Sequence, residues 1–295
     1  MEEKKLNTLI KLLEDPDKRV YDEISSNLIE QGTGIIPELE NAWENYDEHI
    51  QEKLENIIHT IQFQSIQDAF KTWLSWEGID LFEGAFWVAK YQYPEIDFAR
   101  LNEMVDQITR DIWLELSNKL TAIEKIRIIN HFFFTKYGFS KNKTSQFSPQ
   151  YSYINHVLET RKGNSIALSI LYATIAHRLA LPVHCVNLPS NTILAFMDNP
   201  YFDENPYHKN KDDILFYVNP INFGEVLGQQ EIDYFLNQLK IEPKDSYYLP
   251  CNNIEMINQL LLNLITSYDN LGKKSKVKDL KILESYIYNK KNFNL

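Results

Sequence analysis

Residues 161–196, RKGNSIALSILYATIAHRLALPVHCVNLPSNTILAF, constrain the fold more than any other part of the chain. Gly163 and Asn164 predict a turn, and the positions after them are apolar on nearly every side, as in a helix that lies inside a core. The helix is expected to stop at residues 180–182, ALP. Alternating β-branched residues then predict three strands, at residues 183–188, 192–197 and 214–218. The centre of the chain is therefore expected to be one buried helix followed by a β-hairpin and a third strand.

The first 65 residues have a different pattern. The apolar positions 20, 24 and 28 recur at positions 50, 54 and 58, an offset of 30 residues. Stacked helical hairpins have a period of this size, and the stretch LIKLLEDPDKRVYDEISSNLI resembles a HEAT-type repeat. Two copies are few for a repeat array, so an ordinary helical cap is the alternative interpretation.

The spacing of apolar residues predicts that the remaining segments are mainly helical. Helices are expected at residues 69–76, 82–91, 101–116, 122–134, 229–239, 252–268 and 278–288. The aromatic residues of the first two are interpreted as core rather than as a ligand-stacking box. We expect three parts: HEAT-like helical hairpins over residues 1–65, a central domain over 66–250, and a C-terminal helical hairpin over 251–295.

Four short segments around the buried helix carry a resemblance to a known family. They are residues 88–94 (VAKYQYP), 137–139 (YGF), 155–163 (NHVLETRKG) and 217–224 (YVNPINFG). Their order and spacing, together with the turn, helix and hairpin, resemble the transglutaminase-like superfamily and, within it, the bacterial SirB-type branch. The resemblance implies a mostly helical α+β fold with a papain-like and transglutaminase-like core, in which the buried helix packs on a small antiparallel sheet between flanking helical hairpins. The C-terminal hairpin takes the place of a tetratricopeptide-like tail.

The resemblance also implies where catalytic side chains would stand. In catalytic members of the superfamily, a cysteine at the start of the buried helix is the nucleophile, a histidine on the hairpin is the base, and an aspartate on the next strand orients the histidine. The matching positions in this chain hold Ser165, Asn191 and Asn219. All three catalytic positions of the family are therefore changed.

These three residues do not supply a proton-transfer mechanism. A serine hydroxyl attacks only when a base removes its proton, and an asparagine amide does not titrate near neutral pH. His177 lies twelve positions along the same helix as Ser165, about 18 Å along the axis, which is out of reach. His184 and Cys185 are expected on the next strand, where Cys185 is interpreted as a small buried hydrophobe.

Each of the three positions also has a purely structural interpretation. Ser165 can cap the helix, because serine accepts hydrogen bonds from the free N–H groups at a helix start. Asn219 precedes Pro220, and Asn191 lies in a Ser-Asn-Thr turn, both of which are common contexts for asparagine. Only the coincidence of all three with the catalytic positions favours a functional interpretation.

Composition narrows the possible partners. The 295 residues are 44% hydrophobic and 13% aromatic, which is enough for one large core or a few smaller ones. A net charge of −11 argues against a nucleic acid or an anionic membrane, which attract concentrated positive charge. No metal-ligand spacing and no glycine-rich phosphate loop occur, so neither a metal nor a cofactor is expected.

The cysteines and the N-terminal residues indicate a compartment. The chain has only Cys185 and Cys251, its start MEEKKLNTLI has no secretory character, and no apolar run reaches the length of a membrane span. We therefore expect unpaired thiols and a cytoplasmic location.

Two function classes remain open, and the first is favoured. In the first, the chain is a non-catalytic transglutaminase-like protein, a pseudoenzyme or scaffold, that binds a protein or peptide partner through its helical hairpins and its old active-site groove. In the second, it is a hydrolase or acyltransferase in which Ser165 attacks, N–H groups at the helix start stabilise the oxyanion, and an unidentified residue is the base. A titratable group within hydrogen-bond reach of Ser165 would favour the second class.

Overall fold

The computed structural model describes residues 3–143, 148–198 and 210–293, and its contacts divide the chain into two compact units, Met1–Thr72 and Trp73–Leu295. The first unit consists of α1 (Glu3–Leu12), α2 (Lys18–Glu30), the 3-10 turn η1 (Gly32–Ile35), α3 (Ile36–Trp43) and most of α4 (Glu48–Ser75). Residues 69–75, expected as part of a separate helix, are instead the end of α4, and Trp76, an aromatic residue expected in the core, follows α4 and is exposed. Residues 48–75 contain no glycine or proline to interrupt that helix.

The helices of the first unit share one apolar core. Leu28, Leu39 and Leu54, from three different helices, are completely buried in it. Asp17 begins α2, because its carboxylate accepts a hydrogen bond from the N–H of Arg19 at 2.8 Å. Lys53 joins α4 to the end of α1 by donating to the carbonyl of Leu13 at 2.7 Å. These contacts explain how short amphipathic helices are stable here.

The second unit is α+β and mostly helical. Its helices are α5 (Leu81–Gln92), α6 (Phe98–Trp113), α7 (Ala122–Asn130), the π-helical turn η2 (His131–Lys136), the 3-10 turn η3 (Pro149–Ser152), α8 (Ile154–Thr160), α9 (Ser165–Arg178), α10 (Gln229–Gln238), α11 (Asn253–Asn270) and α12 (Lys274–Phe293). Further 3-10 turns are η5 (Lys211–Asp213), η6 (Pro220–Asn222) and η7 (Asp245–Tyr247). The helix expected over 122–134 ends earlier and continues as η2, in which the N–H of Tyr137 reaches the carbonyl of Phe132 at 2.8 Å.

Two small sheets complete this unit. Strands β1 (Ser140–Lys141) and β2 (Lys162–Gly163) form a short parallel pair beside the start of α9. Strands β3 (Val183–Leu188), β4 (Asn191–Met197), β5 (Ile214–Asn219) and β6 (Glu225–Leu227) form an antiparallel sheet in that order. The strands predicted from alternation lie within one residue of the observed bounds, and the predicted fold class is confirmed.

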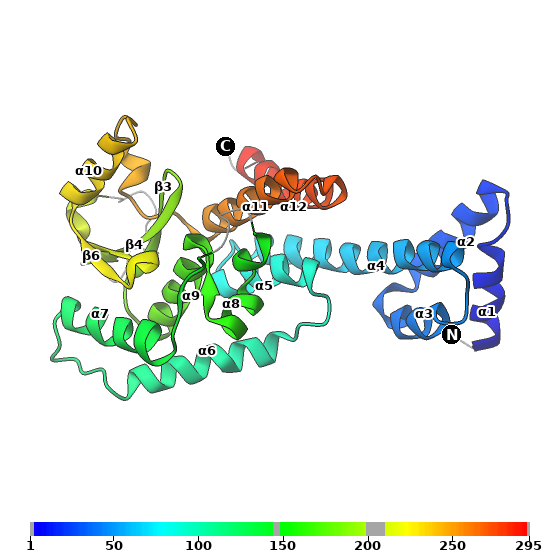
Figure 1. The fold of residues 1–295 in the computed structure, drawn as a ribbon, viewed down its shortest axis with the longest axis horizontal. Helices are drawn as coiled ribbons and strands as arrows, with labels where there is room; N and C mark the ends of the chain where they lie inside the picture. The colour runs from blue at the N-terminus through cyan, green and yellow to red at the C-terminus, as the bar shows by residue number, and fades with distance from the viewer. Residues whose placement is uncertain (1–2, 144–147, 199–209, 294–295) are drawn as a thin grey trace. The chain divides into compact units, whose positions relative to one another are not determined.

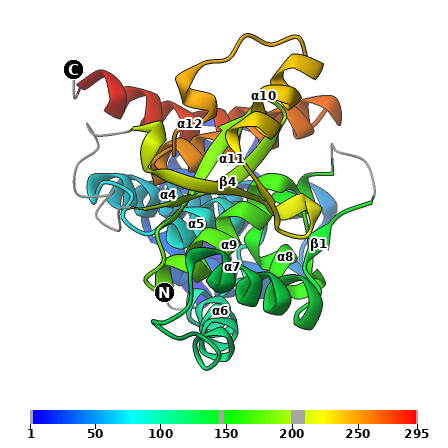
Figure 2. The ribbon, with the colours of Figure 1, turned by 90° about the vertical axis from the view of Figure 1, so that its left-hand side faces the viewer.

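Helix α9 lies at the centre of the second unit (Figures 1 and 2). One side contacts β3 and β4, and other sides contact α5, α6, α8 and α11. Positions 167–176 are all buried, so this helix lacks a solvated face, as its sequence predicts. On the other face of the sheet, Ile232 and Leu236 of α10 pack against Val186 and Ile193. The second unit is therefore layered: α5, α6, α8 and α11 surround α9, α9 packs on one face of the four-stranded sheet, and α10 packs on the other face.

The C-terminal helices are packed against this core. Helices α11 and α12 contact each other, and α11 also contacts α5, α9 and η3 (Figure 1). The hydroxyl of Tyr268 on α11 lies 3.0 Å from that of Tyr153 and donates to the Oε1 atom of Gln92 at 2.8 Å. This buried polar chain fixes α11 next to the segment that leads into the start of α9.

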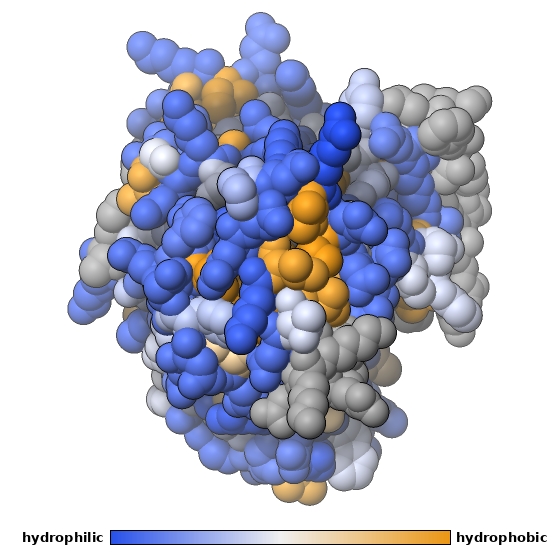
Figure 3. All heavy atoms as spheres, turned by 90° about the vertical axis from the view of Figure 1, so that its right-hand side faces the viewer, coloured by the Kyte–Doolittle hydropathy of each residue, from blue (hydrophilic) through white to orange (hydrophobic). Residues whose placement is uncertain are grey.

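The face of the molecule in Figure 3 is mainly hydrophilic. Figure 3 shows one group of apolar side chains among polar and charged ones on the face that it presents. Isolated apolar groups of this kind are common on protein surfaces. In the part of the chain that the structure describes, no helix combines the length and apolar character needed to cross a membrane.

Candidate functional site

The candidate site is built around the first turn of α9. Asn164 caps this helix, because its Oδ1 atom accepts a hydrogen bond from the N–H of Ala167 at 2.9 Å. Ser165 is the first helical residue and is half-buried. The interpretation of Ser165 as the capping residue is therefore wrong, since the preceding asparagine has the extended backbone of the cap. The Ser165 side chain is left without a capping role.

A polar network holds the start of α9 in place. The Nδ2 atom of Asn164 donates to the Oγ atom of Ser152 at 2.8 Å and to the Oδ1 atom of Asn263 at 3.2 Å. Ser152 in turn donates to the same Asn263 oxygen at 2.9 Å. Three separate segments, η3, α9 and α11, therefore meet at the site through hydrogen bonds between side chains.

Ser165 and Asn191 line the same pocket, which has a volume of about 210 Å³. Its described lining consists of Lys141, Asn142, Asn164, Ser165, Ser190, Asn191, Ile221, Asn263, Thr266 and Ser267. Asn219 is not among these residues. The structure thus brings together Ser165 and Asn191, two of the three residues predicted to stand at the family's catalytic positions, in one pocket.

Asn219 nevertheless lies close to Asn191 along the sheet. Leu194 pairs with Val218, and continuing this register places Asn219 beside Ile193, so Asn191 and Asn219 are diagonal neighbours on one face. The Oδ1 atoms of both asparagines are buried, and neither receives a hydrogen bond from a described residue. Two neutral acceptors therefore lie at the positions that the sequence resemblance matches to the histidine and the aspartate of catalytic members, a match that stays a prediction.

Neither a carboxylate nor an imidazole lies in the described lining of this pocket. Lys141 is the only charged side chain in the described lining. The rings of His177 and His184 lie 5.0 Å apart at the opposite end of α9 from Ser165, as the helical spacing predicts. Within the described residues, no group of three potential metal ligands occurs.

Cys185 is no substitute for the missing nucleophile. It is fully buried on β3, and burial, with a smaller contribution from Cys251, raises the pKa of its thiol well above the ordinary value. A buried thiol with a raised pKa is unreactive, because the thiolate is the nucleophile. Its interpretation as a small buried hydrophobe agrees with this environment.

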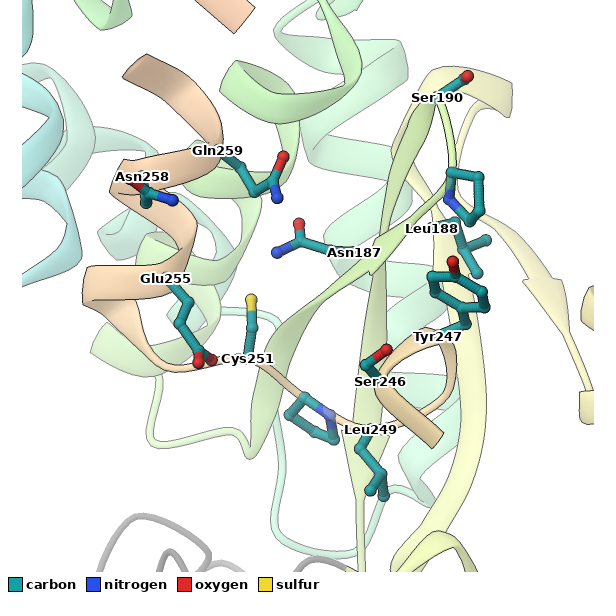
Figure 4. Close-up of a pocket in the computed structure, with 12 residues that line it drawn as sticks. Asn187, Leu188, Ser190, Ser246, Tyr247, Leu249, Cys251, Glu255, Asn258 and Gln259 are labelled. Atoms are coloured by element: carbon teal, nitrogen blue, oxygen red, sulfur yellow. The ribbon is translucent and has the colours of Figure 1, made fainter. Parts of the chain in front are cut away.

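A second, larger cavity adjoins this pocket. It has a volume of about 650 Å³ and lies between β3, the segment 246–251 and α11 (Figure 4). Ser190 lines both cavities, and α11 lines both with successive turns, first Glu255 to Gln259 and then Asn263 to Ser267. The two cavities therefore form neighbouring parts of one depression along α11.

Sequence patterns do not reveal the contribution of α11 to the site. They predict its apolar stripe, but Asn263 and Thr266 lie on the other side of the helix, where polar residues are normally solvated. Only the long-range packing of α11 against η3 and α9 turns that side into a wall of the site. Asn164 has a detectable signal, because asparagine directly before an apolar helix is a preferred cap.

Comparisons with known proteins agree with this architecture. The family model described as "Transglutaminase-like superfamily" matches residues 99–262, which include Ser165, Asn191 and Asn219 and end within α11, just before Asn263. More than half of the chain lies in this match, and the chain therefore belongs to the transglutaminase-like superfamily. The predicted resemblance is confirmed.

Curated relatives are similar over part of their length. A UPF0162 protein of Xylella fastidiosa is 26% identical over 156 residues, which are 53% of this chain and 51% of the relative. The UPF0162 protein YchA of Escherichia coli is 26% identical over 172 residues, 56% of this chain and 59% of the relative. F-box only protein 21 of the mouse is 24% identical over 152 residues, 50% of this chain and 22% of the relative. The chain thus matches about half the length of the bacterial relatives, and no solved structure matches it.

Proposed function

We propose that this chain is a non-catalytic member of its superfamily, a pseudoenzyme that binds a segment of a protein or peptide partner at the position of the family's catalytic site. The observation that carries the proposal is the chemistry of the pocket at Ser165. Its described lining consists of amides, hydroxyls, one isoleucine and Lys141, without a carboxylate or an imidazole. The amides and hydroxyls form hydrogen bonds with peptide groups and do not titrate near neutral pH, which leaves Lys141 as the one group in the described lining that is able to transfer a proton.

The unpartnered oxygens support binding. A buried acceptor without a donor costs about 1–3 kcal/mol, so native structures normally satisfy such atoms. The Oδ1 atom of Asn191 is buried, and this residue lines the pocket. Because this oxygen is not accessible in the structure, a peptide N–H group reaches it only when the Asn191 side chain rotates towards the pocket.

The size of the pocket supports a peptide side chain as the occupant. Sites for whole small molecules are typically about 300–1,000 Å³, and this pocket has about 210 Å³. A single side chain fits such a volume, and the rest of the segment then lies outside it. The adjoining cavity provides that space.

The helices of the first unit suit the same role. Two helical hairpins that share one core are compatible with HEAT-like repeats, which present extended surfaces to protein partners. The proposed setting is the cytoplasm, in which both cysteines remain thiols. The partner in this proposal is a protein rather than a nucleic acid or a membrane, because the net charge is −11.

A first experiment separates binding from serine chemistry. The full chain is incubated with a fluorophosphonate, and labelling of Ser165 is followed by peptide mass spectrometry, with Ser165→Ala as the blank. We expect labelling of Ser165 no faster than in the denatured chain, because no base activates the hydroxyl. Rapid and selective labelling of Ser165 in the folded chain would contradict the proposal and favour a hydrolase or acyltransferase.

A second experiment tests binding directly. A phage-displayed library of random linear dodecapeptides is selected on the immobilised full chain, and the affinity of the selected peptides is measured by fluorescence anisotropy. We expect Ser165→Ala to bind within about twofold of the parent, and Thr266→Arg, at the wall of the pocket, to bind at least about tenfold more weakly, which is about 1.4 kcal/mol. Asn270→Arg is the matched control, because Asn270 is exposed on the same helix and does not line the pocket. Failure to select any peptide, or equal binding by Thr266→Arg and Asn270→Arg, would refute the proposal.

A further inference from the structure

Strand β3 has a free edge at the larger cavity. It is the first strand of the four-stranded sheet and pairs with β4 on one side only. On its other side, the carbonyl of Cys185 accepts a hydrogen bond from the N–H of Cys251 at 2.8 Å. In the described part of the chain, no backbone hydrogen bond continues this pairing towards Asn187. The edge is therefore covered at Cys185 and open two residues further on.

The open part of the edge presents backbone groups to the cavity. Backbone groups alternate between the two sides of a strand, so the N–H and C=O of Asn187 point the same way as the carbonyl of Cys185, away from β4. Asn187, Leu188 and Pro189 all line the cavity. Pro189 has no N–H group and so limits pairing at that end. About three to four residues of an extended chain fit along such an edge at about 3.3 Å per residue.

The two sides of this edge differ in chemistry. Figure 4 shows the Asn187 side chain pointing towards Gln259 of α11. Asn258, the residue before Gln259 on that helix, also lines the cavity. The Oδ1 atom of Asn187 is buried and receives no hydrogen bond from a described residue. On the other side of β3, Leu188 lies near Tyr247, and Leu249 belongs to the same wall (Figure 4). One wall is therefore rich in amides and the other is apolar.

The charge of the cavity limits the occupant further. Glu255 is the only charged residue among its described lining, which contains no cation. An acidic segment would meet this carboxylate without a counter-charge, whereas a neutral or basic segment would not. The net charge of −11 acts in the same direction over a longer range.

We propose that the peptide partner adds an extended strand to the β3 edge in this cavity, with alternating side chains that are apolar on the Tyr247 side and amide-bearing, hydroxyl-bearing or basic on the α11 side. The main-chain hydrogen bonds are made with the N–H and C=O of Asn187, as in other cases of strand addition. Because Ser190 lines both cavities, a residue just beyond the paired stretch reaches the pocket at Ser165. The inference rests on the proposed function and specifies the chemistry of the partner and the direction of its approach.

The reactivity of the Cys251 thiol can be used to measure whether a peptide occupies the cavity. Its side chain lines the cavity and is partly exposed, whereas Cys185 is buried. A maleimide is reacted with the full chain, with and without a saturating dodecapeptide selected as above, and Cys251→Ser identifies the labelled position by peptide mapping. We expect a bound peptide to slow the labelling of Cys251 at least about tenfold.

Backbone pairing is tested with methylated peptides. In an edge strand only every second peptide N–H faces the partner strand, so N-methylation removes a hydrogen bond at alternate positions only. We expect N-methyl scanning of a selected peptide to weaken binding at least about tenfold at the residue whose N–H donates to the carbonyl of Asn187 and less than about threefold at the residue on either side of it, so that strong and weak effects alternate. Asn258→Arg should weaken a basic peptide at least about tenfold, and Asn270→Arg should leave it within about twofold.

The outcomes separate this inference from the proposed function. Peptides that protect Cys251 and show the alternating methylation pattern support strand addition. Peptides that require the Ser165 pocket but leave Cys251 labelling unchanged, or show no alternation, overturn strand addition and leave the proposed function standing. The absence of any selected peptide overturns both.

Discussion

Replacement of Gly224 by alanine should lower the free energy of unfolding of the second unit by more than the cost of placing alanine in a left-handed backbone conformation. Gly224 follows η6 and has a φ angle of 73°, in the left-handed region. Its N–H donates to the carbonyl of Asn219 at 3.0 Å, and its carbonyl accepts from the Nδ2 atom of Asn130 at 2.8 Å. A Cβ atom added to Gly224 would lie 2.1 Å from the Oδ1 atom of Asn130, so that side chain must move.

Movement of Asn130 affects a buried tyrosine. The hydroxyl of Tyr172, which is completely buried on α9, donates to the Oδ1 atom of Asn130 at 2.8 Å. Left-handed backbone costs alanine about 1–2 kcal/mol relative to glycine. Loss of the partner of a buried hydroxyl costs about 1–3 kcal/mol more. The expected total for Gly224→Ala is therefore about 2–5 kcal/mol, or a decrease of about 4–20 °C in the midpoint of thermal unfolding for a unit of this size.

A matched control isolates the contribution of Asn130. Gly138 has a φ angle of 74°, and no atom lies within 4 Å of the position that a Cβ atom would take there, so Gly138→Ala carries the backbone cost alone. Thermal unfolding of the full chain is followed by near-ultraviolet circular dichroism, which reports the packing of aromatic side chains such as Tyr172. Equal decreases for Gly224→Ala and Gly138→Ala would refute the reasoning, because the contact with Asn130 would then contribute nothing.

Two further predictions follow from the surroundings of the site. Asn164→Ala should lower the free energy of unfolding by about 1–3 kcal/mol, because it removes the cap of α9 and leaves polar groups around Asn263 unpaired. Ser165→Ala should change the free energy of unfolding by less than about 0.5 kcal/mol. Urea unfolding measures both values, and a larger effect of Ser165→Ala than of Asn164→Ala would contradict the assignment of Asn164 as the cap. Burial lowers the pKa of His156 in the folded chain below its ordinary value of 6.5. As the pH falls below 6.5, the unfolded chain therefore takes up a proton at this histidine before the folded chain does. The free energy of unfolding that neutral His156 contributes is fully present above pH 6.5 and decreases as the pH falls towards the folded pKa. The thermal midpoint should accordingly fall less steeply between about pH 7 and pH 5 in His156→Gln than in the parent, and identical slopes would show that His156 does not contribute.

Local patterns are sufficient to predict the central part of the fold. The alternation at 183–188 and the continuous apolar character of 166–176 are local signals of a strand and of a helix buried on all sides, whichever elements cover them. The packing of α11 against the start of α9 cannot be predicted in this way. Asn263 is 99 residues from Asn164, and its polar side chain has no distinctive local signal. Long-range contact, rather than sequence pattern, makes it part of the site.

The segments that resemble the family largely support the backbone around the pocket. In 155–163, Arg161 adopts a left-handed conformation with a φ angle of 61° at the end of α8, and its guanidinium lies 4.8 Å from the ring centre of Phe139, a residue of segment 137–139. In 217–224, Gly224 holds the turn after Asn219 against Asn130. These contacts depend on backbone shape and not on proton transfer, so they do not require titratable side chains at Ser165, Asn191 and Asn219. If the proposed function is right, the amides and hydroxyls of the pocket bind a peptide group without any turnover, so binding assays with Thr266 and Asn258 variants test it more directly than a search for enzymatic activity.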